Sequence, residues 1–365
     1  MATKRLRVAL IGAGMIANAG HVPAWRNAQD EAELVAVFSR DLGKAQRTAQ
    51  RAGIPAAYDS VDKMLAEAQP DVAVICTPNT SHHAITLKAL RAGAHVLCEK
   101  PAATTRAEIE EMFAVARKVG RTLMIGQSGR FNPTMSAAKA FADEGRLGEV
   151  YYAETSALRR RGVPQWGRFH IKADSGGGAL LDIGVHALDG LMWITGNPRV
   201  VAANGAIYTK LANQDEGLIT SLADSGAPVG VFDPRPYDYH EFDVEDLGVG
   251  MLRLENGATI TIRASWAANV PPGMGGTVVI GTVGGIRMNP FTLVTNLGHY
   301  QVDVTPKVPE DPSIPFYGHW REVQHLIGVL RGREELIVKP AEVINVIAAL
   351  EALYISAEEG HEVWL

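Results

Sequence analysis

A glycine motif near the start of the chain constrains the fold more than any other feature. The apolar run 7–11 leads directly into Gly12-Ala13-Gly14-Met15-Ile16-Ala17, a G-x-G-x-x-A pattern. The first glycine allows a tight turn, the second lets a pyrophosphate approach the backbone, and the final small residue lets a helix pack closely on the strand. The helix N-terminus then offers N–H groups and a positive dipole end to phosphates. The motif therefore predicts a dinucleotide site.

Strands and helices alternate over the first third of the chain. The expected strands are 7–11, 34–38, 71–76, 95–98 and 122–125, and the expected helices are 14–27, 44–52, 82–92 and 107–119. Nearly continuous β-branched strands separated by helices indicate a parallel sheet that is covered on both faces. We therefore expect residues 1–125 to form an α/β Rossmann domain with a doubly wound parallel sheet.

The pattern changes after Gly126. Longer strands are expected at 149–156, 200–209, 247–255, 259–265 and 277–282, and two helices at 319–330 and 340–359. Turns such as Asn256-Gly257 between strands favour a largely antiparallel sheet. Residues 126–365 are thus expected to form a second, α+β domain. The segment 224–240 is expected to be an exposed loop, and its role is left open.

Charge and composition exclude several classes of protein. The 35 Lys and Arg residues and 40 Asp and Glu residues give a net charge of −5, which does not favour a nucleic-acid binder. No run of about 18 uncharged apolar residues predicts a membrane span. The two cysteines, Cys76 and Cys98, suggest reduced buried thiols. A secretion signal would need an apolar run that Gly12 and Gly14 interrupt, so we expect a cytoplasmic protein.

The end of the second strand bears on the choice between NAD and NADP. An acidic residue there would bind the ribose hydroxyls and repel a 2′-phosphate. This chain has Ser39 and Arg40 instead, followed by Asp41. A hydroxyl beside a guanidinium suits a phosphate, because arginine can bind it with two parallel hydrogen bonds. NADP is the expected cofactor, and NAD stays open because Asp41 can pair with Arg40 or reach the ribose.

Two further motifs follow the third and fourth strands. These are Thr77-Pro78-Asn79 and Glu99-Lys100-Pro101, both at carboxyl ends of parallel strands, where ligands bind in open α/β sheets. A lysine at this place can hydrogen-bond a substrate oxygen and stabilise the negative charge that develops there during hydride transfer. The alternative for a single lysine is an ordinary surface charge.

A glycine-rich stretch leads into a helix expected over residues 179–194. Asp182 and His186 are four residues apart, so they should be neighbours on one face. A carboxylate beside a histidine raises the pKa of the imidazolium and can fix its tautomer, which suits acid–base work on an alcohol. Taken alone, such a pair is more often structural.

Together these motifs resemble the glucose–fructose oxidoreductase / inositol dehydrogenase / MocA (Gfo/Idh/MocA) family of NAD(P)-dependent oxidoreductases over essentially the full chain. The resemblance implies a Rossmann domain joined to an α+β domain with a large open-faced sheet, and substrate between them. It implies that Lys100, Asp182 and His186 form the catalytic group. It also implies that homodimers or homotetramers assemble through the open sheet.

The segment before the glycine-rich stretch bears on the substrate. It carries Arg159-Arg160-Arg161, Trp166, Arg168 and His170, which suit a hydroxyl-rich ring such as a glucoside or another pyranose. The alternative for the arginine run is a solvated face. The spacings of His82-His83, His240 and His319 do not suggest a metal site, so no metal is expected.

The expected activity is the interconversion of a secondary alcohol and a ketone on a cyclic sugar or polyol (a pyranose, glucoside or inositol) by hydride transfer. The residues expected at the cofactor are Gly12, Gly14, Met15, Ile16, Ser39, Arg40, Thr77, Pro78, Asn79, His82, Glu99, Lys100 and Gln127. The residues expected at the substrate are Lys100, Arg159, Trp166, Arg168, His170, Asp182 and His186. Two alternatives stay open, an NAD-dependent glycosidase and a sugar- or cofactor-sensing protein without catalysis.

Overall fold

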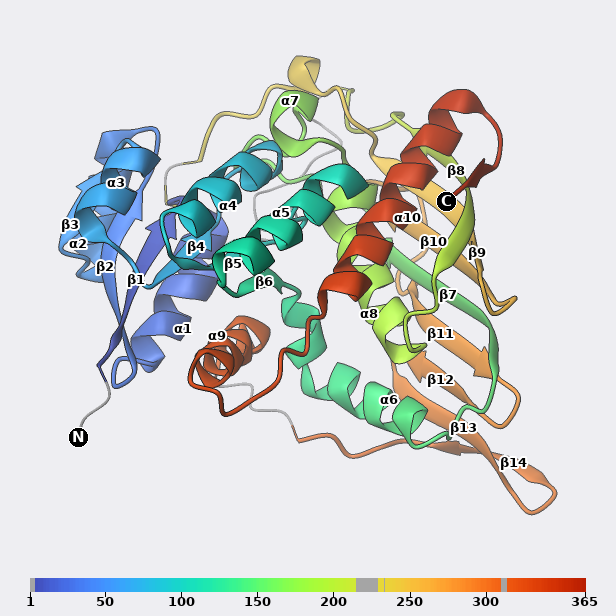
Figure 1. Ribbon diagram of the computed structural model, residues 1–365. Coiled ribbons are helices and arrows are strands. Elements are labelled where there is room, and N and C mark those ends of the chain that lie inside the picture. Colours follow the sequence, from blue (N-terminus) through green and yellow to red (C-terminus); the bar gives the residue numbers. More distant parts are fainter. Residues whose placement is uncertain (1–3, 215–228, 233, 310–313) are drawn as a thin grey trace.

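The chain builds two sheets that lie side by side (Figure 1). The computed structural model describes residues 4–214, 229–232, 234–309 and 314–365. One sheet has six strands in the order β3-β2-β1-β4-β5-β6, and all of its pairings are parallel. The other has nine strands in the order β14-β13-β12-β11-β7-β10-β9-β8-β15. The expected fold class, a Rossmann-like parallel sheet followed by a mostly antiparallel sheet, is confirmed.

The six-stranded sheet is completely buried at its centre. Its strands are β1 (Leu6–Ile11), β2 (Ala32–Phe38), β3 (Ala56–Tyr58), β4 (Val72–Ile75), β5 (His95–Glu99) and β6 (Leu123–Gly126). The helices between them are α1 (Val22–Asn27), α2 (Leu42–Ala52), α3 (Val61–Ala68), α4 (His82–Arg91) and α5 (Arg106–Val119). All four residues of β4 are buried, as a strand covered on both faces requires.

Two elements of this region were not expected from the sequence. The edge strand β3 has only three half-buried residues, Ala-Ala-Tyr after a proline, and so it lacks the β-branched run that marks the central strands. The short helix α3 follows it, with Ser60 as its N-cap. The helix expected over 14–27 is also interrupted. It contains a π-helical turn, Ala17–His21, and α1 begins only at Val22, just before Pro23.

The nine-stranded sheet contains one parallel pairing, between β7 and β10, among antiparallel ones. Its strands are β7 (Val150–Leu158), β8 (Val200–Tyr208), β9 (Leu247–Leu254), β10 (Thr259–Ser265), β11 (Gly276–Gly281), β12 (Gly285–Met288), β13 (Phe291–Leu297), β14 (Tyr300–Val304) and β15 (Val363–Trp364). Figure 1 shows α6 (Pro133–Asp143), α8 (Val185–Ile194) and α10 (Pro340–Glu359) on one side of it. Among the residues that the figure draws as ribbon, the other side carries no helix.

The last two long helices connect the two halves. Helix α9 (Tyr317–Leu330) places Val323, Leu326 and Ile327 in the core of the parallel sheet. Helix α10 contributes Ile347 to that core and Leu350 to the core of the other sheet. The boundary expected at residue 125 therefore stays a prediction, because segments after it complete the first core.

Helix α10 is also long and apolar enough to cross a membrane by length and composition, with a mean hydropathy of 1.4. No such helix was expected from the sequence. Half of its candidate span is buried inside the protein. This burial is what the core helix of a globular protein requires, since its apolar side chains are already covered by other parts of the chain.

Candidate active site

A cleft of about 510 Å³ is lined by residues from both halves of the molecule. Its walls come from the glycine loop after β1, the ends of β2, β4 and β5, and the start of the helix that carries His186. Most of the expected site residues line it: Gly12, Gly14, Met15, Ile16, Ser39, Arg40, Thr77, Pro78, Asn79, His82, Glu99, Lys100, Arg159, Trp166, Arg168, Asp182 and His186. The structure thus brings together motifs that are far apart in the sequence.

The glycine loop fits a dinucleotide. Gly12 has a φ of 123°, and a Cβ there would lie 2.5 Å from the carbonyl oxygen of Cys76. At Gly14 nothing lies within 4 Å of an added Cβ, so the backbone is open where it lines the cleft. The first turn of the following helix has N–H groups without intrahelical partners. This combination provides a cradle that a pyrophosphate can fill.

Cationic side chains line one end of the cleft. Arg40, Lys44 and Arg51 lie there with the hydroxyl of Ser39. Asp41 acts as the N-cap of α2, because its Oδ1 accepts a hydrogen bond of 3.1 Å from the backbone N–H of Lys44. The carboxylate of Asp41 is therefore engaged by the helix. The Arg40 side chain is 74% exposed, with one nitrogen 3.9 Å from Oδ1 of Asp174.

Lys100 and Asp182 are in direct contact although 82 residues separate them in the sequence. The ammonium of Lys100 donates to the Asp182 carbonyl (2.9 Å) and to its Oδ1 (3.0 Å), and the indole N–H of Trp266 donates to Oδ2 (3.0 Å). Burial acts to raise the pKa of Asp182, but the charges of Lys100 and Arg159 outweigh it and hold this pKa below its usual value. Asp182 is thus an ionised partner that fixes the lysine.

A glycine-rich entry sets the position of Asp182. A Cβ at Gly178 would overlap the backbone carbonyl of Glu245, so only glycine fits there. The carboxylate of Glu245 accepts hydrogen bonds of 2.8 Å from the N–H groups of Gly178 and Leu180. The helix expected over 179–194 begins as a π-helical turn, Leu180–Gly184, and continues as α8. Such turns are frequent at functional sites.

His186 lies in the cleft without a hydrogen bond to any residue that the structure describes. Burial, together with the nearby Lys100 ammonium, lowers its pKa to about 3, and the opposing effect of Asp182 is smaller. Asp182 does act to raise this pKa, as expected, but burial and Lys100 outweigh it, and no hydrogen bond joins Asp182 to His186 among the residues that the structure describes. The carboxylate is committed to Lys100 and Trp266, and His186 is a neutral imidazole near neutral pH.

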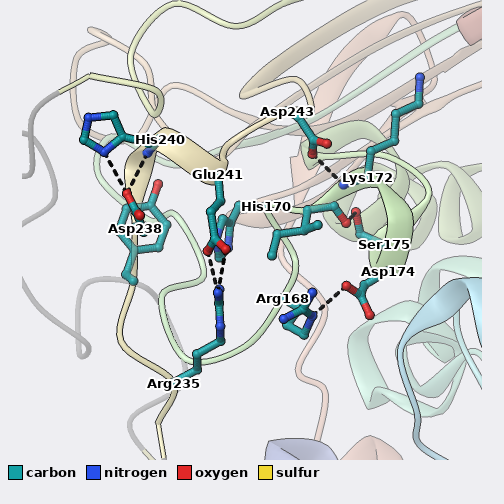
Figure 2. A network of polar contacts seen from close by, with 12 residues as sticks. Arg168, His170, Lys172, Asp174, Ser175, Arg235, Asp238, His240, Glu241 and Asp243 are labelled. Atoms are coloured by element: carbon teal, nitrogen blue, oxygen red, sulfur yellow. Dashed lines mark hydrogen bonds and ion pairs between the residues drawn. The ribbon is translucent and has the colours of Figure 1, made fainter.

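The structure does not bring His170 or Gln127 to the cleft. His170 is fully buried beside the ion pair of Arg235 and Glu241 (Figure 2), with its Nε2 3.8 Å from Oε2 of Glu241. Its ring packs 4.8 Å from that of Tyr237. Gln127 is 2% exposed and is not among the lining residues, although its neighbour in the chain, Ser128, is. Neither position supports the contact with ligand expected from the sequence.

Two aromatic residues, Trp166 and Phe169, form part of the cleft wall. Trp166 lines the cleft beside Phe169, with their rings 5.7 Å apart. The indole N–H of Trp166 is buried and has no hydrogen-bond partner within the described part of the chain. Arg168, in contrast, is paired with Asp174 at 2.6 Å (Figure 2). The wall therefore offers aromatic ring surface to a ligand.

Several lining residues were missed by the sequence analysis. They are Asn18, Lys44, Arg51, Gly230, Val231, Phe232, Phe316 and His319. Arg51 lies seven residues after Lys44, a helical spacing that the sequence already contains, and its guanidinium carbon is 4.2 Å from the Phe232 ring centroid. Of the expected loop 224–240, residues 224–228 and 233 lie outside the described residues. No local motif marks Phe232 or Phe316.

Comparisons with known proteins agree with this arrangement. The family model described as "Oxidoreductase family, NAD-binding Rossmann fold" matches residues 6–127, and the model described as "GFO/IDH/MocA C-terminal domain" matches residues 135–287. D-glucoside 3-dehydrogenase of Escherichia coli (strain K12) is 33% identical, covering 100% of this chain and 99% of that protein.

Two solved structures are similar over their whole length. One is the aldose–aldose oxidoreductase from Caulobacter crescentus complexed with glycerol, with a TM-score of 0.76 and 27% identity, covering 99% of this chain and 100% of that one. The other is GenD2 from gentamicin A biosynthesis in complex with NAD. It also has a TM-score of 0.76 and 27% identity, covering 100% of this chain and 97% of that one.

Proposed function

We propose, on the premise that this chain belongs to the Gfo/Idh/MocA family of NAD-binding oxidoreductases, that it interconverts a secondary alcohol and the corresponding ketone on a cyclic sugar or polyol. One observation carries the proposal. The ammonium of Lys100, fixed by Asp182, and the neutral imidazole of His186 lie in the cleft that the glycine loop also lines. These are the groups that hydride transfer at an alcohol carbon requires.

Each of the three side chains has a separate role in the proposed reaction. The imidazole of His186 takes the hydroxyl proton of the alcohol, since it is neutral and has no hydrogen-bond partner among the described residues. Lys100 donates a hydrogen bond to the same oxygen and stabilises its developing negative charge. Asp182 holds Lys100 in place through Oδ1. A bound nicotinamide would supply the hydride acceptor, and Gly12, Gly14 and the following helix start would hold its pyrophosphate.

Turnover measurements on two variants test these roles. Lys100→Ala and His186→Ala should each lower kcat by about 10²–10⁴, the range for electrostatic and acid–base groups. Lys88→Ala is the matched control, because Lys88 is 49% exposed and pairs with Asp62 on the surface. Cofactor binding, followed by fluorescence titration, should persist in all three. Turnover near the wild-type value in both site variants would exclude the assignment.

A pyranose is the proposed substrate class. The rings of Trp166 and Phe169, which line the cleft, can cover the apolar face of a sugar ring. The similarity to a D-glucoside 3-dehydrogenase supports the same class. Inositols, free pyranoses and methyl glucosides should be screened for cofactor reduction at 340 nm. Release of free sugar without a change in absorbance would indicate a glycosidase instead.

We also propose that NADP is preferred over NAD. Ser39, Arg40, Lys44 and Arg51 give the cleft a phosphate-binding end, while Asp41 is occupied in capping α2. The ratio of kcat/KM for NADP over NAD tests this preference. Arg40→Ala should lower the ratio about tenfold or more, the effect of losing a charge-assisted hydrogen bond. An unchanged ratio would remove the argument.

The uncovered side of the nine-stranded sheet is the proposed surface for assembly into a homodimer or homotetramer. Tyr208 in β8 is 42% exposed, although it is a large side chain within a strand. An exposed apolar sheet surface favours association. Sedimentation at micromolar concentration should give a mass that is a multiple of 39.2 kDa. A monomer mass would contradict the proposal.

A further inference from the structure

A residue that the sequence motifs do not include lies beside the catalytic group. His319, in the first turn of α9, lines the cleft together with Lys100, Asp182 and His186. Its side chain is 13% exposed. It comes from a segment more than 130 residues beyond His186, so no local pattern connects the two. Its Nδ1 has no hydrogen-bond partner among the residues that the structure describes.

The imidazole of His319 is held from three sides. Its Nε2 lies 3.4 Å from Oε1 of Glu99, which also contacts Nε2 of His21 at 2.7 Å. Its ring packs edge-on against that of His21, with the centroids 5.5 Å apart. Gly20 leaves the necessary room, because a Cβ there would approach the His319 ring to 3.1 Å. The ring is therefore fixed in place before any ligand binds.

The residue that starts α9 has an unusual backbone conformation. Phe316 has a φ of 53° and a ψ of 44°, the left-handed region that side chains rarely adopt. Such a conformation costs about 1–3 kcal/mol and is found mostly at functional sites. The Phe316 carbonyl accepts hydrogen bonds from the N–H groups of His319 and Trp320, and its ring lies 5.7 Å from the His319 ring. The strained turn thus presents both side chains to the cleft.

We propose that His319 is a substrate-specificity residue, whose Nδ1 hydrogen-bonds a hydroxyl of the sugar ring next to the reacting carbon. The proposal rests on the proposed function, since it assumes a hydroxyl-bearing substrate beside Lys100 and His186. A hydroxyl is the fitting ligand because it can donate to or accept from an imidazole nitrogen. Glu99, which holds Nε2, is a positioning residue, and Phe316 packs on the ring of the same substrate.

Two isosteric variants separate this role from a structural one. In His319→Asn the amide replaces Nδ1, whereas in His319→Gln it replaces Nε2 and keeps the contact with Glu99. We expect KM for methyl α-D-glucopyranoside to rise about 3- to 12-fold in His319→Gln, the effect of one lost hydrogen bond. The KM of His319→Asn for the same substrate should stay within about twofold of the wild-type value. Arg321→Ala, on the exposed side of α9, is the control.

Monodeoxy derivatives of methyl α-D-glucopyranoside identify the hydroxyl. The wild type should discriminate against one derivative, and His319→Gln should lose that discrimination while His319→Asn keeps it. Cofactor affinity and melting temperature should be unchanged in both variants. Three results would overturn the proposal. KM stays normal in His319→Gln but rises in His319→Asn, only the cofactor affinity changes, or neither variant alters KM. Lys100→Ala is measured in parallel, because wild-type turnover there would refute the proposed function itself.

Discussion

The contact between Asp182 and Lys100 gives a quantitative prediction. Both side chains are largely buried, with 12% and 16% exposed, and the carboxylate accepts from Lys100 and from Trp266 at 3.0 Å each. In Asp182→Asn one side-chain oxygen remains for the two donors. Lys100 keeps its hydrogen bond to the Asp182 carbonyl, so the Trp266 indole N–H is the donor that is left unpaired when the amide oxygen faces Lys100. Losing a charge-assisted hydrogen bond and leaving a buried donor unsatisfied should lower the free energy of unfolding by about 3–5 kcal/mol.

Urea unfolding at pH 7, followed by tryptophan fluorescence and circular dichroism, measures this loss. Asp143→Asn is the matched control, because Asp143 pairs with Lys139 on the surface and is 60% exposed. Its loss should stay below about 0.5 kcal/mol. In the double variant Asp182→Asn/Lys100→Met, the two losses should be less than additive, since both remove one interaction. Equal losses of unfolding free energy in Asp182→Asn and Asp143→Asn would refute the reasoning. So would strictly additive losses in the double variant.

Two further predictions concern His186 and the glycines. The pKa of His186 is about 3 in the folded protein and about 6.5 in the unfolded chain. Between these pH values the unfolded chain binds more protons, so the free energy of unfolding falls as the pH drops from 6.5 toward 3. Between pH 7 and 5, the free energy of unfolding of His186→Gln should therefore fall by about 2 kcal/mol less than that of the wild type. An equal dependence of this free energy on pH in both proteins would contradict the assignment. Gly178→Ala should lower the melting temperature because its Cβ overlaps the Glu245 carbonyl, whereas Gly14→Ala should melt like the wild type and bind cofactor more weakly. A Gly14→Ala variant with unchanged cofactor affinity would count against the dinucleotide cradle.

Strong local patterns were enough to predict the central elements of the fold. Strands such as β1 and β4 are buried on both faces, so their apolar runs are continuous in the sequence. Of the missed strands, β3, β14 and β15 lie at sheet edges, where burial is partial, whereas β12 and β13 lie inside the nine-stranded sheet but have only one buried residue each. Strand β14 is an example, since four of its five residues are exposed. Periodicity reports burial, and it weakens where a strand has only one covered face.

The site could be predicted only where its residues form a local motif. The Gly12 loop and the pair of Asp182 and His186 are such motifs, and the structure places them in one cleft. The partner of Asp182 could not be predicted, because Lys100 reaches it only through the packing of the two halves. His170 was misjudged because a histidine near the right segment gives no sign of which way it faces. His319 was missed for the same reason.

Helix α10 has a consequence for how the molecule folds and moves. Its Ile347 is buried in the core of the six-stranded sheet and its Leu350 in the core of the nine-stranded sheet, less than one helical turn apart. Because this helix follows every strand except β15 in the chain, neither hydrophobic core can be completed during synthesis until its residues have emerged. In the folded protein, α10 packs against both sheets and connects the two hydrophobic cores. Wide movement of one half against the other would expose apolar side chains of both cores to water, so α10 opposes such movement.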